Sequence, residues 1–132
     1  METAGTIPKP PGAYEECTSV AVPIIEVLGR ISGKWSLYVI MALLHGPMRF
    51  SELRRQVHGV SQKMLTQTLR ELEEDGLLRR TVTPIIPPRV DYELAVMGRE
   101  LQDPLAAIHA WTIRNSPHVA KARERYAAAR AG

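Results

Sequence analysis

Residues 60–76 read VSQKMLTQTLRELEEDG and carry the clearest structural pattern in the chain. Its apolar positions recur at the spacing of one helix face, at Leu65, Leu69 and Leu72. Ser61 is a favoured N-cap residue, and Gly76 readily takes the left-handed conformation that ends helices. We therefore expect an amphipathic helix that begins after Ser61 and runs to Asp75.

The opposite face of this predicted helix is polar. Its residues are Gln62, Lys63, Thr66, Gln67 and Arg70, and the N-cap Ser61 precedes them. Such side chains hydrogen-bond to base edges and phosphates, and the first of them lie at the helix N-terminus, where a recognition helix normally enters the major groove. Carboxylates begin only at Glu71. For this helix alone, an ordinary solvated polar face is an equally good interpretation.

The segments before this helix favour DNA binding. A first helix is expected from Pro23, with an apolar face of Ile24, Val27, Leu28 and Ile31. A second, from Lys34 to about His45, is apolar on every side, which predicts burial from several directions. A third helix carries the apolar stripe Phe50, Leu53 and Val57. The turn at Gly59 then joins it to the predicted recognition helix, as in a helix-turn-helix.

Two strands are expected after Gly76, because the apolar period changes to about two. The alternating positions are Leu78, Val82, Val90, Tyr92 and Leu94. The stiff, proline-containing segment 83–88 connects the strands, so the hairpin has the form of a wing. Arg89 stands where the wing turns back, and is either a DNA contact or a solvated arginine. Further candidates for contact with the DNA backbone are Arg49, Arg54, Arg55, Arg79 and Arg80.

The C-terminal part is expected to be helical again from about Met97. Its predicted apolar face is Leu101, Leu105, Ile108 and Trp111, with a kink at Pro104. Ser116 and Pro117 predict the start of a separate, basic final helix. The predicted fold is mainly α with a small β-hairpin, a winged helix-turn-helix. Its expected divisions are a disordered tail over 1–16, the winged domain over 17–115, and a basic helix over 116–132.

Composition fits this interpretation. The chain has 132 residues, of which 45% are apolar and 23% charged, as in a single globular domain. The net charge of +3 is compatible with a polyanionic partner. A single cysteine excludes an internal disulfide, and neither a signal peptide nor a membrane span is indicated, so we expect a cytoplasmic protein.

Five ordered motifs resemble the HxlR-type regulators of the MarR-like winged-helix group: GKW at 33–35, RFSELR at 49–54, VSQKMLT at 60–66, DGL at 75–77 and PPRV at 87–90. The resemblance covers about residues 17–111. It implies a bacterial or archaeal origin, homodimers formed through N- and C-terminal helices, and palindromic operators in double-stranded DNA. It also implies that Gln62, Lys63, Thr66, Gln67 and Arg70 face the DNA, with Arg89 in the wing.

The resemblance also draws attention to Cys17. Some members of the family sense aldehydes, quinones or hypochlorite through a cysteine near the N-terminus. Here Thr18 replaces the usual following proline, and Glu15 and Glu16 would raise the thiol pKa rather than activate it. An inert packing residue and a redox or electrophile sensor are therefore both open. Farther along the chain, Ala95 replaces a threonine common in the family, so the next helix lacks its expected cap.

Other classes of function have less support. The four histidines are scattered, and no nucleophile elbow or glycine-rich loop is present, so we expect no metal, no cofactor and no enzyme activity. A winged-helix protein-interaction module is the alternative. A small-molecule effector is a further hypothesis, because Tyr14, Trp35, Tyr38 and Trp111 could line a cavity between subunits; packing in the core is the other interpretation of these aromatic residues.

Overall fold

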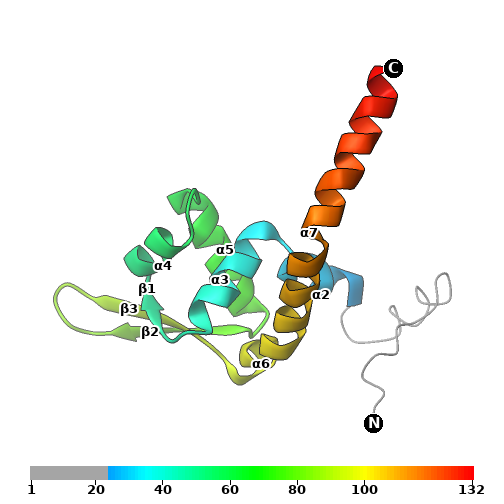
Figure 1. Cartoon of the computed structure of the whole chain (residues 1–132). Helices are drawn as coiled ribbons and strands as arrows, with labels where there is room; N and C mark the ends of the chain where they lie inside the picture. Colours follow the sequence, from blue (N-terminus) through cyan, green and yellow to red (C-terminus); the bar gives the residue numbers. More distant parts are fainter. Residues whose placement is uncertain (1–23) are drawn as a thin grey trace, which may run out of the picture.

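The computed structural model describes residues 24–132 (Figure 1). Its elements in chain order are α2 (Ile24–Ile31), α3 (Lys34–Leu43), β1 (Met48–Arg49), α4 (Phe50–Gln56), α5 (Gln62–Glu74), β2 (Leu78–Thr83), β3 (Arg89–Leu94), α6 (Val96–Arg99) and α7 (Gln102–Ala131). The predicted mainly helical fold with a small hairpin is confirmed. The expected tail over 1–16, Tyr14 and Cys17 lie outside the described residues.

The core lies where α3, α4, α5 and the sheet meet. Every predicted apolar position of α5 is buried, and so are Leu53 and Val57 around α4. From α3, the residues Val39, Ile40 and Leu43 are fully buried against them. The amphipathic pattern of the sequence therefore orients α4 and α5 as expected.

The prediction that α3 is buried from several directions is wrong for one side of that helix. Tyr38 is 48% exposed and Met41 is 41% exposed. Core packing is therefore also wrong for Tyr38, and for Trp111 of α7, which is 54% exposed. Trp35 does pack against the core. In this chain α3 contacts the core through one side, so Tyr38 and Met41 on its other side remain exposed apolar residues.

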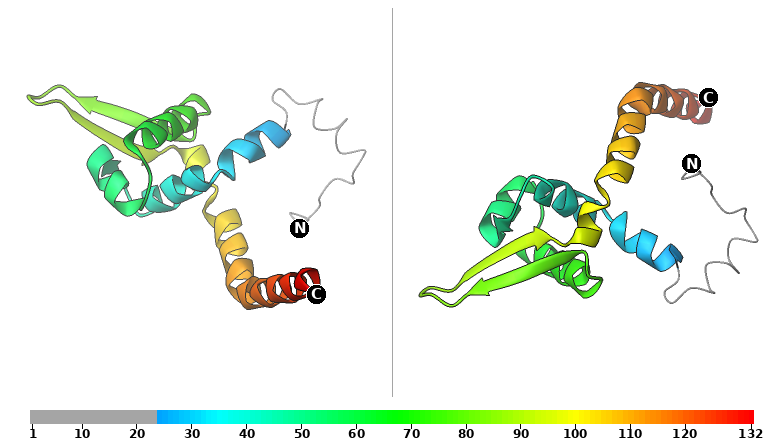
Figure 2. Two further views of the ribbon diagram at one scale, coloured as in Figure 1. Left: turned by 90° about the horizontal axis from the view of Figure 1, so that it is seen from above. Right: turned by 90° about the horizontal axis from the view of Figure 1, so that it is seen from below.

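The sheet has three antiparallel strands in the order β1, β3, β2. The sequence predicted β2 and β3 but not β1, because a strand of two residues leaves no alternating pattern. Met48 pairs with Tyr92, and Leu78 pairs with Leu94 at the base of the hairpin. Thr83 pairs with Arg89 at the far end, so segment 84–88 forms the tip of the wing, which projects from the body (Figures 1 and 2).

The C-terminal helices differ from the prediction in three places. The single helix expected from about Met97 is divided into α6 and α7, with a turn at residues 100–101. Pro104 lies in the first turn of α7, where its missing N–H has no partner within the helix, so the kink expected there is wrong. The separate helix expected from Ser116 is also wrong, because α7 continues through Pro117 to Ala131. Figure 2 shows that α7 bends in its middle. The helix tolerates Pro117 as a bend rather than a boundary.

Gly98 fixes the short helix α6 against the connection between α5 and β2. The helix begins after Ala95, whose side chain cannot cap it, and the Ala95 amide instead donates to the Leu77 carbonyl at 2.9 Å. Gly98 is buried, and a Cβ on it would collide with the same carbonyl oxygen. Only glycine allows the two backbones to approach this closely.

We therefore expect Gly98→Ala to lower the free energy of unfolding by about 1–3 kcal/mol, because the added methyl forces the backbones apart. Urea denaturation at a fixed protein concentration measures the loss. Gly29→Ala is the matched control, because nothing lies within 4 Å of a Cβ added to that helical glycine. Equal losses of unfolding free energy in the two variants would show that the close approach of the backbones at Gly98 does not contribute to stability.

Candidate nucleic-acid interface

Helix α5 begins and ends as its sequence predicts. The Ser61 hydroxyl oxygen accepts a hydrogen bond from the Met64 amide at 3.0 Å, which is an N-cap contact. Gly59 and Gly76 on either side of the helix have φ values of +87° and +78°, a conformation that other residues rarely adopt. Two well-formed ends therefore fix which residues lie on each face.

The exposed face of α5 collects the predicted DNA-contacting residues. Ser61, Gln62, Lys63, Thr66, Gln67 and Arg70 are all exposed. The last five of them line one shallow hollow on the surface. Sequence reasoning therefore selected side chains that lie together in space, at the N-terminal and central part of the helix.

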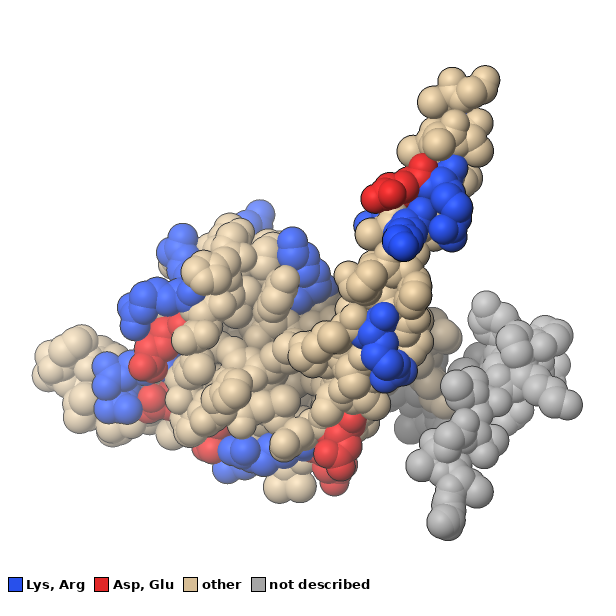
Figure 3. All heavy atoms as spheres, viewed as in Figure 1, with Lys and Arg blue, Asp and Glu red and all other residues tan. Residues whose placement is uncertain are grey.

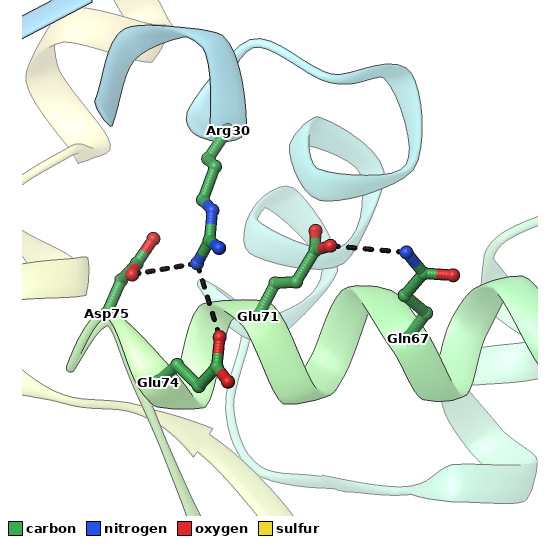
Figure 4. A network of polar contacts seen from close by, with 5 residues as sticks. All are labelled: Arg30, Gln67, Glu71, Glu74 and Asp75. Carbon is green, nitrogen blue, oxygen red and sulfur yellow. Dashed lines mark hydrogen bonds and ion pairs between the residues drawn. The ribbon is translucent and has the colours of Figure 1, made fainter. Parts of the chain in front are cut away.

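The hollow also contains Arg30 of α2, which the sequence analysis did not predict. Its guanidinium lies 2.9 Å from an Asp75 carboxylate oxygen and 3.4 Å from a Glu74 carboxylate oxygen (Figure 4). The hydrogen bond to Asp75 and the negative charge of that carboxylate raise the pKa of Arg30. No local pattern could have predicted this contact, because 45 residues separate Arg30 from Asp75.

Glu71 marks the point where the exposed face of α5 turns acidic. Its carboxylate accepts a hydrogen bond from the Gln67 side-chain amide at 3.3 Å (Figure 4). Glu71 and Glu74 both border the hollow at the C-terminal end of the helix. The basic and neutral residues that suit DNA therefore occupy the first part of α5, and the carboxylates occupy the last part.

Arg89 is the first residue of β3 and is exposed at the base of the wing tip. Its Nε lies 3.0 Å and 3.3 Å from the two carboxylate oxygens of Asp91, two residues along the same strand. Asp91 stands opposite Arg49 of β1 and Thr81 of β2 in the sheet. Arg89 is therefore held by a carboxylate on the sheet, a partner that the sequence analysis did not predict.

The other candidate arginines are all exposed: Arg49, Arg54, Arg55, Arg79 and Arg80. In the view of Figure 3, lysine and arginine side chains occur at several separate places on the body, and a further group lies on the outer part of α7. Among these five, Arg80 has a carboxylate partner within the described residues: its Nε lies 3.7 Å from Glu73.

Residues 24–132 contain no cluster of three or more histidine, cysteine, aspartate or glutamate side chains arranged to hold a metal ion. Within the same residues, no helix has both the length and the apolar character needed to cross a membrane.

Comparisons with known proteins agree with this arrangement. A family model described as HxlR-like helix-turn-helix matches residues 30–120. The chain is 42% identical over 106 residues to the uncharacterized HTH-type transcriptional regulator YtfH of Escherichia coli K12, covering 80% of this chain and 84% of that protein. Similar solved structures include a transcriptional regulator ytfH from Salmonella typhimurium, with 42% identity, a TM-score of 0.71, and 79% and 93% of the two chains covered.

A second similar structure is the redox regulator HypR in its oxidized form, with 38% identity, a TM-score of 0.65, and 70% of this chain and 96% of that chain covered. The family match spans the helix-turn-helix, including all of α5, together with the wing and part of α7. The chain therefore belongs to the HxlR-like helix-turn-helix family of transcriptional regulators.

Proposed function

We propose that the chain is a sequence-specific DNA-binding repressor whose recognition helix is α5. The observation that carries this proposal is the exposed cluster Gln62, Lys63, Thr66, Gln67 and Arg70 on the first part of α5. These side chains include donors and acceptors for base edges, and the carboxylates that border the same hollow, Glu71 and Glu74, lie toward the C-terminal end of the helix. Helix α5 enters the major groove, and the wing with Arg89 lies along the flanking backbone.

The proposed operator-binding form is a homodimer. Large apolar side chains are exposed on α2, including Ile25 at 62%, and on α7, including Ile108 at 60% and Trp111 at 54%. Large exposed apolar side chains on terminal helices favour association with a second copy. A two-fold dimer presents two recognition helices about 34 Å apart, in successive major grooves of a palindromic operator.

The first test is selection of the full-length protein on a pool of random DNA duplexes at near-physiological salt. We expect enrichment of a palindrome whose half-sites are one helical turn apart, because two equivalent α5 helices read it. Sequencing of the retained duplexes gives both the motif and the spacing. Weak, salt-sensitive retention without a motif would instead favour a winged-helix module that binds proteins.

Lys63 tests whether α5 reads bases. We expect Lys63→Ala to weaken binding to the selected operator by about 1–3 kcal/mol, with less effect on unrelated duplexes, if the amine contacts a guanine. Fluorescence anisotropy with both duplexes measures the difference. Lys121→Ala removes the same charge from the outer part of α7 and should leave discrimination unchanged. Operator affinity equal to that of the parent protein would remove Lys63 from the interface.

Trp111 tests the dimer. We expect Trp111→Glu to produce a folded monomer with weakened operator binding, because a buried, unpaired carboxylate opposes the association of α7 with a second copy. Light scattering after gel filtration measures the mass. Ile86→Glu is the control, because Ile86 is a fully exposed apolar residue at the wing tip and should leave the mass unchanged. A Trp111→Glu protein that remains dimeric would place the subunit contact elsewhere.

A further inference from the structure

A cleft between α5 and the sheet brings two residues of the predicted recognition face together with residues of the sheet. We call it the α5–sheet cleft, and its lining residues are Thr66, Leu69, Arg70, Glu73, Arg80 and Tyr92. Thr66 and Arg70 come from the exposed face of α5, whereas Arg80 comes from β2 and Tyr92 from β3. Figure 2 shows α5 lying beside the base of the hairpin. The cleft therefore borders both the recognition helix and the wing.

The strand register explains why Arg80 faces this cleft. Arg80 pairs with Tyr92. Two residues earlier in the strand, Leu78 pairs with Leu94, and these two leucines are buried in the core. Alternate residues of a strand point to the same face, so Arg80 lies on the face that packs against α5. Arg79 lies on the opposite face, where it pairs with Glu93. Two consecutive arginines of equal charge thus point to different sides of the hairpin.

The electrostatics of the cleft favour an anion. Arg70 and Arg80 supply two positive charges, against the single carboxylate of Glu73. The ion pair of Arg80 with Glu73 is long, at 3.7 Å, and both side chains are nearly half exposed. An exposed pair of this kind contributes little, so the Arg80 guanidinium remains available to a stronger partner.

Tyr92 completes the wall of the cleft as a neutral donor. Burial raises the pKa of its phenol. The positive charge of Arg80 lowers this pKa and the negative charge of Glu73 raises it, but burial has the largest effect. The hydroxyl therefore keeps its proton at neutral pH and can donate a hydrogen bond. Arginine, threonine and tyrosine side chains are donors that commonly contact DNA phosphates.

The geometry of DNA binding identifies the anion. With α5 in the major groove and the wing along the flanking backbone, as proposed above, a backbone strand at the edge of the major groove passes between the helix and the hairpin. We propose that the α5–sheet cleft binds one backbone phosphate of each half-site, held by Arg80 together with Arg70, Thr66 and Tyr92. This inference rests on the proposed DNA-binding function. It gives Arg80 a phosphate contact that Arg79 lacks.

The experiment compares Arg80→Ala with Arg79→Ala on the selected operator and on an unrelated duplex, with affinity measured over a range of salt concentrations. Each phosphate contact contributes about 1 to the slope of log affinity against log salt. For a dimer we therefore expect Arg80→Ala to reduce the slope by about 2 and to weaken both duplexes alike. Arg79→Ala, with the same loss of net charge, should leave the slope close to that of the parent protein.

Ethylation of single phosphates locates the contact. In the parent protein, ethylation at one phosphate per half-site should block binding, and in Arg80→Ala this interference should disappear at that phosphate alone. Arg80→Lys, which keeps the charge, should retain most of the slope and covers the case in which Arg80→Ala does not fold. Equal slopes for the Arg79→Ala and Arg80→Ala proteins, or an unchanged interference pattern, would overturn the inference.

The same data separate this inference from the proposed function. A parent protein that binds no duplex selectively would contradict the proposed function, whatever the arginine variants do. A parent protein that selects an operator through Lys63 but shows no difference between Arg79 and Arg80 keeps the proposed function and loses the phosphate site.

Discussion

The burial of one face of α5 fixes the orientation of the helix and of the side chains that it presents to solvent. Leu65, Leu69 and Leu72 are almost completely buried against the core, so rotation of the helix about its axis would expose them. The polar face is thereby fixed outward, and the N-cap at Ser61 and the glycine turn at Gly76 fix its ends. The helix is held rigidly enough to present a set of side chains to a partner.

The acidic end of α5 requires a second kind of stabilisation. Carboxylates near a helix C-terminus are unfavourable, because the unsatisfied carbonyl groups there carry partial negative charge. In this chain each of them has a polar partner. Glu71 accepts from Gln67, Glu73 lies beside Arg80, and Arg30 contacts Glu74 and Asp75. The contacts of Arg30 attach the end of the recognition helix to α2. The long, exposed pair of Glu73 with Arg80 contributes little to this attachment.

The terminal helices α2 and α7 carry large apolar side chains that a single chain leaves exposed. No residue of α2 or α7 is buried, although both carry large apolar side chains. In the C-terminal region, the partly buried residues that pack against the core are Leu101 and Leu105, which lie at its start. The winged body is therefore well packed by itself, whereas its terminal helices have apolar surface left for a second copy. This division matches the proposed roles of DNA reading and association.

Local signals in the sequence predicted the elements whose residues interact within one turn or one strand. Helical spacing, the Ser61 cap and the glycine turns predicted α5 with its two faces, and alternation predicted β2 and β3, because these signals depend only on near neighbours. Four features emerged only from the folded chain: the pairing of Arg30 with Asp75, the two-residue strand β1, the exposed side of α3 and the passage of α7 through Pro117. Those features depend on surfaces from distant segments, which no local period encodes.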